Sequence, residues 1–203
     1  MARRDEPAIR RQRARIADEV ARLLAEGAES DPARARRKVA ERLGVRDEAA
    51  LPGGDEIRAA VLAYRQLFAP ADGGRLRAQR EAALAAMQHF AHLDPRLAGP
   101  VLDGSADART PVTLHLHADD PDAVTHALLE RDVPARQSQA AVRLDRRQRI
   151  DVPAWRFSAG GVDFELLQLP LSAARQAPWD PLEDRPLERA GIAALRRLLD
   201  AAG

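Results

Sequence analysis

The sequence predicts an α+β protein in which an N-terminal helical region precedes a small mixed-sheet domain that ends in a C-terminal helix. Residues 1–92 are dense in Ala, Arg, Glu and Leu and poor in β-branched residues, which is a helical composition. Residues 93–203 instead contain short β-like runs that alternate with turns. With 203 residues, 45% of them hydrophobic, the chain can build one sizeable core or one domain with a helical appendage.

Four helices are expected in residues 1–92, where apolar residues recur at helical spacing. Asp31 followed by Pro32 is a typical N-cap and first helical position, and Gly44 is a typical stop for the same helix. The expected helices cover about Ile9–Ala25, Ala33–Leu43, Asp55–Phe68 and Arg75–His92.

Residues 93–203 are expected to hold five strands and two helices. The β-like runs are Pro100–Leu102, Val112–His117, Ser138–Leu144, Ile150–Phe157 and Val162–Leu169. Asp120-Pro121 opens a helix between the second and third runs, and Gly160-Gly161 predicts a tight hairpin turn between the last two. Ser172–Pro186 holds three prolines and is expected to be a loop, after which a last helix covers about Leu187–Ala201.

Composition excludes several classes of protein. The 32 basic and 31 acidic residues nearly cancel, which argues against binding of polyanions over the whole surface. The absence of cysteine excludes disulfide frameworks, thiol nucleophiles and cysteine-based zinc sites. The charged start contains no apolar run typical of a signal peptide or a membrane span. We therefore expect a cytoplasmic protein without membrane contact.

Two of the expected strands carry titratable residues on one face. Because side chains alternate along a strand, His115 shares a face with His117, and Asp163 shares a face with Glu165. Brought together, these residues could supply a general acid–base pair or hold a divalent metal. A solvated sheet face, or histidines bonded to backbone carbonyls, explains the same pattern. Both interpretations stay open at the level of sequence.

The segment Leu97–Ala106, followed by Thr110–His117, resembles the signature of the polymerase-β-like nucleotidyltransferase superfamily. That signature is a Gly-Ser turn, a second glycine, and then Asp-x-Asp on a strand, with a third carboxylate on a later strand. The resemblance implies a nucleotidyltransferase-like fold in which the glycine turn approaches nucleotide phosphates and the carboxylates hold divalent metals. The implied nucleotide-binding residues are Gly99, Gly104, Asp103 and Arg109, and Asp163 and Glu165 suit the third-carboxylate place.

A second resemblance spans most of the chain. Ala35–Gly44, Gly99–Gly104 and Arg175–Pro178 are similar to stretches of uncharacterised proteobacterial proteins described only as nucleotidyltransferase-like. This resemblance implies a bacterial protein and brings no activity with it.

The departures from the superfamily signature concern the residues that bind metal. When the glycines are aligned, Pro111 and Thr113 stand where the aspartates belong, and Pro100 replaces the serine. Proline and threonine cannot neutralise a triphosphate–metal complex. The sequence therefore predicts a pseudoenzyme that binds a nucleotide, RNA or a protein partner.

Two alternatives remain. One is a divergent nucleotidyltransferase or metal-dependent enzyme that uses His115, His117 and Glu165, with a divalent metal as cofactor. Arg109, Arg156 and Arg175 are candidates for anion contacts in either case. The other alternative is a helical protein-interaction module for which the α/β half is a scaffold.

The first 46 residues hold thirteen basic and eight acidic side chains. Such a basic stripe can track a phosphate backbone, and a solvated helix face is the competing interpretation. The densest cluster, and the expected nucleic-acid contact, is Arg34, Arg36, Arg37 and Lys38.

Overall fold

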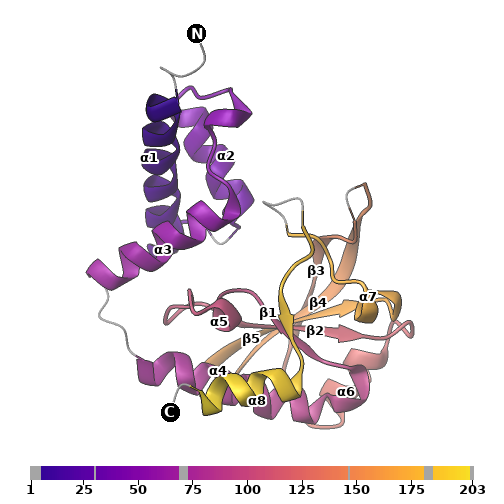
Figure 1. The fold of residues 1–203 in the computed structure, drawn as a ribbon. Helices are drawn as coiled ribbons and strands as arrows, with labels where there is room; N and C mark the ends of the chain where they lie inside the picture. The colour runs from indigo at the N-terminus through magenta and orange to yellow at the C-terminus, as the bar shows by residue number, and fades with distance from the viewer. Residues whose placement is uncertain (1–5, 30, 69–72, 146, 181–184, 202–203) are drawn as a thin grey trace. The chain divides into compact units, whose positions relative to one another are not determined.

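The computed structural model describes residues 6–29, 31–68, 73–145, 147–180 and 185–201 (Figure 1). It confirms an α+β protein with N-terminal helices, a mixed sheet and a C-terminal helix. Internal contacts divide the chain into two compact units, the second of which begins at Gly73. We describe each unit by itself.

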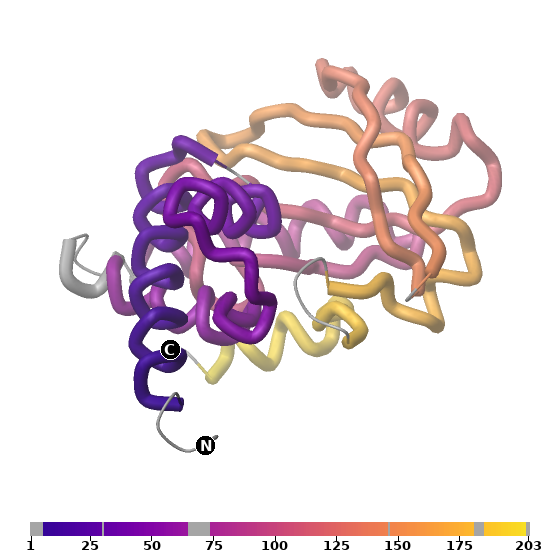
Figure 2. The backbone as a smooth tube through the Cα atoms, turned by 90° about the horizontal axis from the view of Figure 1, so that it is seen from above, coloured from indigo at the N-terminus to yellow at the C-terminus, as the bar shows by residue number. Residues whose placement is uncertain are grey.

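The first unit is a helical bundle. It comprises α1 (Glu6–Ala25), α2 (Pro32–Arg42), the 3-10 helix η1 (Glu48–Ala50) and α3 (Gly54–Phe68). As expected, Asp31 caps α2, and its Oδ1 accepts a hydrogen bond from Ala33 N at 2.8 Å. Figure 1 shows α1 and α2 side by side and α3 running obliquely to them, and Figure 2 shows the same helices from above. Ile16, Val39 and Ile57 are fully or almost fully buried in their shared core.

The second unit is a six-stranded sheet with helices on both faces. Its helices are α4 (Gly73–His89), η2 (Ala91–Leu93), α5 (Pro100–Asp103), α6 (Ala123–Leu129), α7 (Ser172–Arg175) and α8 (Ile192–Asp200). Its strands are β1 (Arg96–Ala98), β2 (Val112–His117), β3 (Arg136–Arg143), β4 (Arg149–Ala159), β5 (Val162–Leu169) and β6 (Arg189–Ala190). The strand order is β3-β4-β5-β2-β1-β6, in which only the β2–β5 pair is parallel among the described strands.

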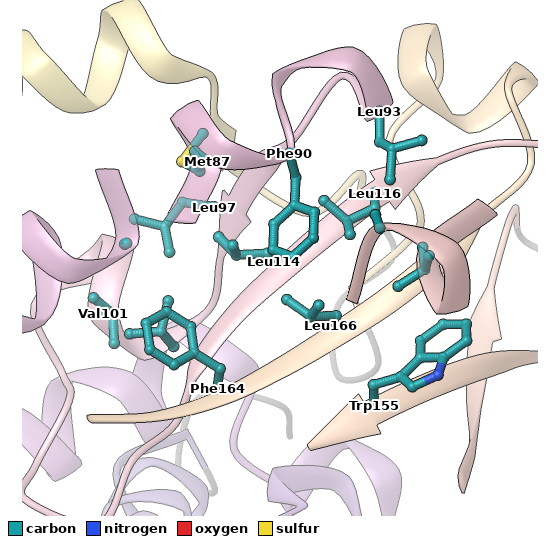
Figure 3. Packing of buried hydrophobic residues seen from close by; sticks show 14 of the residues in the cluster. Met87, Phe90, Leu93, Leu97, Val101, Leu114, Leu116, Trp155, Phe164 and Leu166 are labelled. Carbon is teal, nitrogen blue, oxygen red and sulfur yellow. The ribbon is translucent and has the colours of Figure 1, made fainter. Parts of the chain in front are cut away.

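The two faces of the sheet have different coverings. On the core face, Leu114, Leu116 and Leu166 pack against α4, α6 and α8 and form the main hydrophobic core, which Figure 3 shows from close by. The opposite face carries Thr113, His115 and His117, and we call it the histidine face. α7 covers part of the histidine face through a smaller apolar cluster of Val152, Ala154, Leu167, Leu169 and Ala173.

The structure corrects three expectations about elements. Pro100–Leu102 is part of helix α5, because Gly99 has a positive φ and Pro100 occupies the first helical position; the strand is Arg96–Ala98. The last helix begins at Ile192 because Arg189 and Ala190 pair with β1 instead. The expected loop at Ser172–Pro186 contains α7, and within it Trp179 bridges to Arg143 and to Pro186.

The boundary between the units also differs from the predicted division at residues 92 and 93. The fourth helix, α4, belongs to the second unit because Ala83 and Met87 are fully buried in the core of the sheet domain. Its composition is helical, like that of the first unit, and composition does not reveal which core a helix joins. The hairpin turn at Gly160-Gly161 is confirmed, since both glycines have positive φ and connect β4 to β5.

Candidate functional site

The glycine segment leads directly from β1 to the start of β2. Gly99 has φ 74° and ψ −156°, a conformation that is essentially restricted to glycine, and Gly104 has φ 85°. Helix α4 holds the segment through two polar side chains. Arg80 donates to the carbonyls of Val101 and Leu102, each at 3.0 Å, so the end of α5 is fixed.

The following loop is fixed by the buried side chain of Gln79. Its Nε2 donates to the carbonyl oxygens of Asp107 and Thr110, both at 3.0 Å. Two of the predicted nucleotide-binding side chains lie here, Asp103 at the end of α5 and Arg109 in the loop. Asp103 is exposed and accepts from Ser105 N at 2.8 Å, while the Arg109 side chain is exposed. The loop is therefore rigid in its backbone and open at these side chains.

A polar row crosses the histidine face at the level of Thr113. Its members are in direct register on six neighbouring strands and so point to the same side of the sheet. From β6 to β3 the row reads Arg189, Ala98, Thr113, Glu165, Arg156 and Arg136.

The predicted third carboxylate, Glu165, is the acidic member of this row. Its Oε1 accepts from Arg156 Nε at 2.9 Å and from Arg156 Nη2 at 2.5 Å. The neighbouring Asp163 accepts a hydrogen bond from the hydroxyl of Ser158. Both carboxylates are thus engaged by β4, the strand on the side of β5 away from the histidines.

His117 has a hydrogen-bond partner at each ring nitrogen. Its Nδ1 lies 2.7 Å from the carbonyl oxygen of Asp94, so this nitrogen carries the proton and donates. Its Nε2 therefore accepts, from Arg189 Nη1 at 3.1 Å. Burial is the main cause of the lowered pKa of His117, and the charge of Arg189 lowers it further, against the opposing hydrogen bond to Asp94. His117 is a neutral link between β2, β6 and the turn before β1.

His115 contrasts with His117. It is 3% exposed, and its buried Nδ1 has no hydrogen-bond partner among the described residues. Burial, followed by the charges of Arg189 and His117, lowers the pKa of His115 to about 3. His115 lies in register between Arg96 on β1 and Leu167 on β5. It is a neutral, buried imidazole with unused hydrogen-bonding capacity.

The four predicted catalytic residues therefore lie on one face but do not converge. Glu165 is in register with Thr113 and not with either histidine. Across the described ranges, no three His, Asp or Glu side chains are grouped as a metal ion would require. These side chains thus do not fit the expected divalent metal. Both ring nitrogens of His117 are hydrogen-bonded, and the carboxylate of Glu165 is paired with Arg156. The catalytic roles of these residues stay predictions.

The predicted nucleic-acid cluster on α2 is largely compensated by neighbouring carboxylates. Arg34 and Lys38 each lie 3.9 Å from the carboxylate of Glu29, and Arg36 lies 3.3 Å from that of Glu48. Arg37 is exposed. Elsewhere in this unit, a surface hollow of about 320 Å³ is lined by Arg11, Gln12, Arg15, Ile16 and Leu43.

Sequence reasoning missed the residues that organise the histidine face. Arg189 was expected in the last helix, and its two-residue strand is too short to show periodicity. Arg96 is the first residue of β1, and Asp94 lies just before that strand in a left-handed conformation with φ 43°. A basic residue directly after the Asp94-Pro95 pair is the signal that could have drawn attention to Arg96.

No family model, curated protein or solved structure matches the chain. Of the helices that the structure describes, none has both the length and the hydrophobicity to cross a bilayer.

Proposed function

We propose that the protein binds a nucleotide on the histidine face of its second unit and does not catalyse nucleotidyl transfer. The observation that carries this proposal is the ion pair of Glu165 with Arg156, opposite Thr113 in register. In the superfamily that the sequence resembles, these strand positions would present carboxylates to divalent metals. Here β2 offers a hydroxyl, and β5 offers a carboxylate that a guanidinium already neutralises.

The glycine segment supports the binding half of the proposal. A Cβ placed on Gly99 would meet no atom within 4 Å, so a ligand can approach the backbone there closely. Gln79 and Arg80 hold the segment in place before any ligand arrives, which lowers the entropy cost of binding. Arg109 lies in the loop that follows α5, where its exposed side chain can contact a phosphate.

Calorimetric titration with ATP, combined with a pyrophosphate-release assay, tests this proposal. We expect ATP to bind equally well in EDTA and in magnesium, without release of pyrophosphate. Arg109→Ala should weaken binding by roughly tenfold, the equivalent of one charge-assisted hydrogen bond. Arg197→Ala, which removes an exposed arginine from α8, is the matched control and should leave the affinity unchanged.

Two outcomes would overturn the proposal. Transfer of labelled nucleotide to an acceptor, abolished by Glu165→Ala, would establish an active transferase. Absence of ATP binding together with salt-sensitive RNA binding would favour the basic helices of the first unit as the functional surface.

A further inference from the structure

Two arginines and two histidines converge at the β6 end of the histidine face. Arg189 on β6 donates to His117 Nε2 at 3.1 Å and to the carbonyl of Ala174 at 3.4 Å. Arg96 on β1 is in register with His115. We call Arg96, Arg189 and His115 the arginine cluster.

The arginine cluster has an excess of positive charge. Arg96 is paired with Asp94 through Nη1 to Oδ1 at 2.8 Å and Nη2 to Oδ2 at 3.0 Å. Among the described residues, no carboxylate lies within salt-bridge distance of Arg189, and both partners of this half-buried guanidinium are neutral. One carboxylate, that of Asp94, therefore serves two guanidinium groups. Burial lowers the pKa of Arg189, and the charge of Arg96 lowers it further, against the opposing charge of Asp94. A partly buried charge without a counter-ion is unfavourable unless a bound anion neutralises it.

His115 adds an independent indication that a partner is absent. It is 3% exposed, and its buried Nδ1 has no hydrogen-bond partner among the described residues. Buried polar groups in folded proteins are usually satisfied, so a buried ring nitrogen without a partner, beside two guanidinium groups, points to a missing ligand. A neutral imidazole can donate one hydrogen bond to an oxyanion.

The cluster is also preorganised. His117 holds Arg189, because its Nδ1 is committed to Asp94 and leaves Nε2 to accept from the guanidinium. Gly191 leaves room for Arg96, since a Cβ there would lie 3.0 Å from Arg96 Nη1. The Arg96 side chain is 30% exposed, so solvent reaches this end of the cluster.

We propose that the arginine cluster binds a phosphate group, either free phosphate or the phosphate of a larger ligand such as a nucleotide. The forked donors of two arginines match the oxygens of a phosphate, and its negative charge compensates Arg189. The site goes beyond the proposed function. It is inferred from the contacts of Arg96, Arg189 and His115, and it does not require that ATP be the ligand.

Calorimetric titration of the full chain with inorganic phosphate, AMP and adenosine tests the site, with sodium chloride at matched ionic strength as the blank. We expect phosphate and AMP to bind and adenosine not to bind. An AMP affinity at least roughly tenfold above that of phosphate identifies a larger phosphate-bearing ligand. Comparable affinities identify free phosphate. Heats that do not exceed the chloride blank overturn the proposal.

Two variants locate the binding. Arg189→Gln should weaken phosphate binding by at least roughly tenfold, as loss of a charged hydrogen-bond donor does. Because Arg189 also links β6 to β2, Gly191→Ala provides a second route: its Cβ displaces Arg96 and leaves the bonds of Arg189 intact. Arg197→Gln on α8 is the matched control. Phosphate affinity that is equal in wild type and both cluster variants overturns the site. Loss of ATP binding in Arg109→Ala with phosphate binding retained separates this site from the proposed function.

Discussion

His115 and His117 occupy the same strand face, yet their surroundings give them different physical roles. His117 is satisfied at both nitrogens by Asp94 and Arg189 and thereby connects three segments. His115 is buried, and its Nδ1 has no hydrogen-bond partner among the described residues. A pattern of alternating histidines cannot distinguish these outcomes, because the distinction depends on which residues the neighbouring strands bring alongside.

The burial of His115 predicts a loss of stability in acid. Its pKa is 6.5 in the unfolded chain and about 3 in the folded chain, so between these values the unfolded state binds more protons. The contribution of neutral His115 is therefore fully present above pH 6.5 and decreases as the pH falls toward 3, by about 1.4 kcal/mol per pH unit. The charge of Arg189, which lowers the pKa of His115 after burial, acts in the same direction.

Urea denaturation at pH 7 and pH 5 checks this prediction. His115→Leu removes the titrating group, so its unfolding free energy should fall by about 2 kcal/mol less than that of wild type between the two pH values. His117 titrates in the same direction and leaves a residual loss in both proteins. An equal acid loss in wild type and His115→Leu would show that His115 does not carry the effect.

At the scale of elements, the glycine segment depends on a single backbone conformation. Gly99→Ala should destabilise the protein by about 1–3 kcal/mol, the usual cost of a non-glycine residue in this region. Because a Cβ at Gly99 meets no atom within 4 Å, the cost comes from the backbone alone. Urea denaturation at pH 7 measures it.

Gly191→Ala is the matched control for the Gly99 variant. Its φ of −79° suits any residue, so we expect a loss of no more than about 1 kcal/mol, from its position at the N-cap of α8 and from the shift of the flexible Arg96 side chain. Equal stabilities of the two variants would show that Gly99 is not held in the glycine-only conformation.

Elements with their own local signals could be predicted from the sequence, and elements that depend on partners could not. Helix α2 has its cap at Asp31 and its stop near Gly44, and both are local. Strand β2 alternates over six residues and was predicted with its observed bounds. β6 is a strand only because β1 lies beside it, and α5 replaces a strand because Gly99 turns the chain into Pro100.

The same division applies to the candidate site. His115 and His117 were predicted to share a face of one strand, and Asp163 and Glu165 a face of another, because alternation within a strand decides this. The direct register of Thr113 with Glu165 is a finding of the structure. The engagement of Glu165 by Arg156 and the position of Arg189 arise from pairing between strands that are distant in sequence. No local pattern encodes such pairing.

At the scale of the whole molecule, two separate hydrophobic cores predict two separately responding units. Ile57 is 2% exposed in the helical core, and Leu114 is fully buried in the core of the sheet unit. Ile57→Ala and Leu114→Ala should each cost about 2–5 kcal/mol in their own unit. Native-state hydrogen exchange should show faster exchange in α1–α3 for the first variant and in the sheet for the second. Faster exchange throughout the chain in both variants would mean that the units unfold together.

We propose that the histidine face of the sheet unit holds a phosphate-bearing ligand. Hydrogen exchange measured by mass spectrometry, with and without saturating ATP and without divalent metal, tests this proposal. We expect slower exchange in β1, in α5 with the loop up to Pro111, and in β6, with the helices of the first unit unchanged. Slower exchange confined to α1–α3, or no change anywhere in the chain, would contradict it.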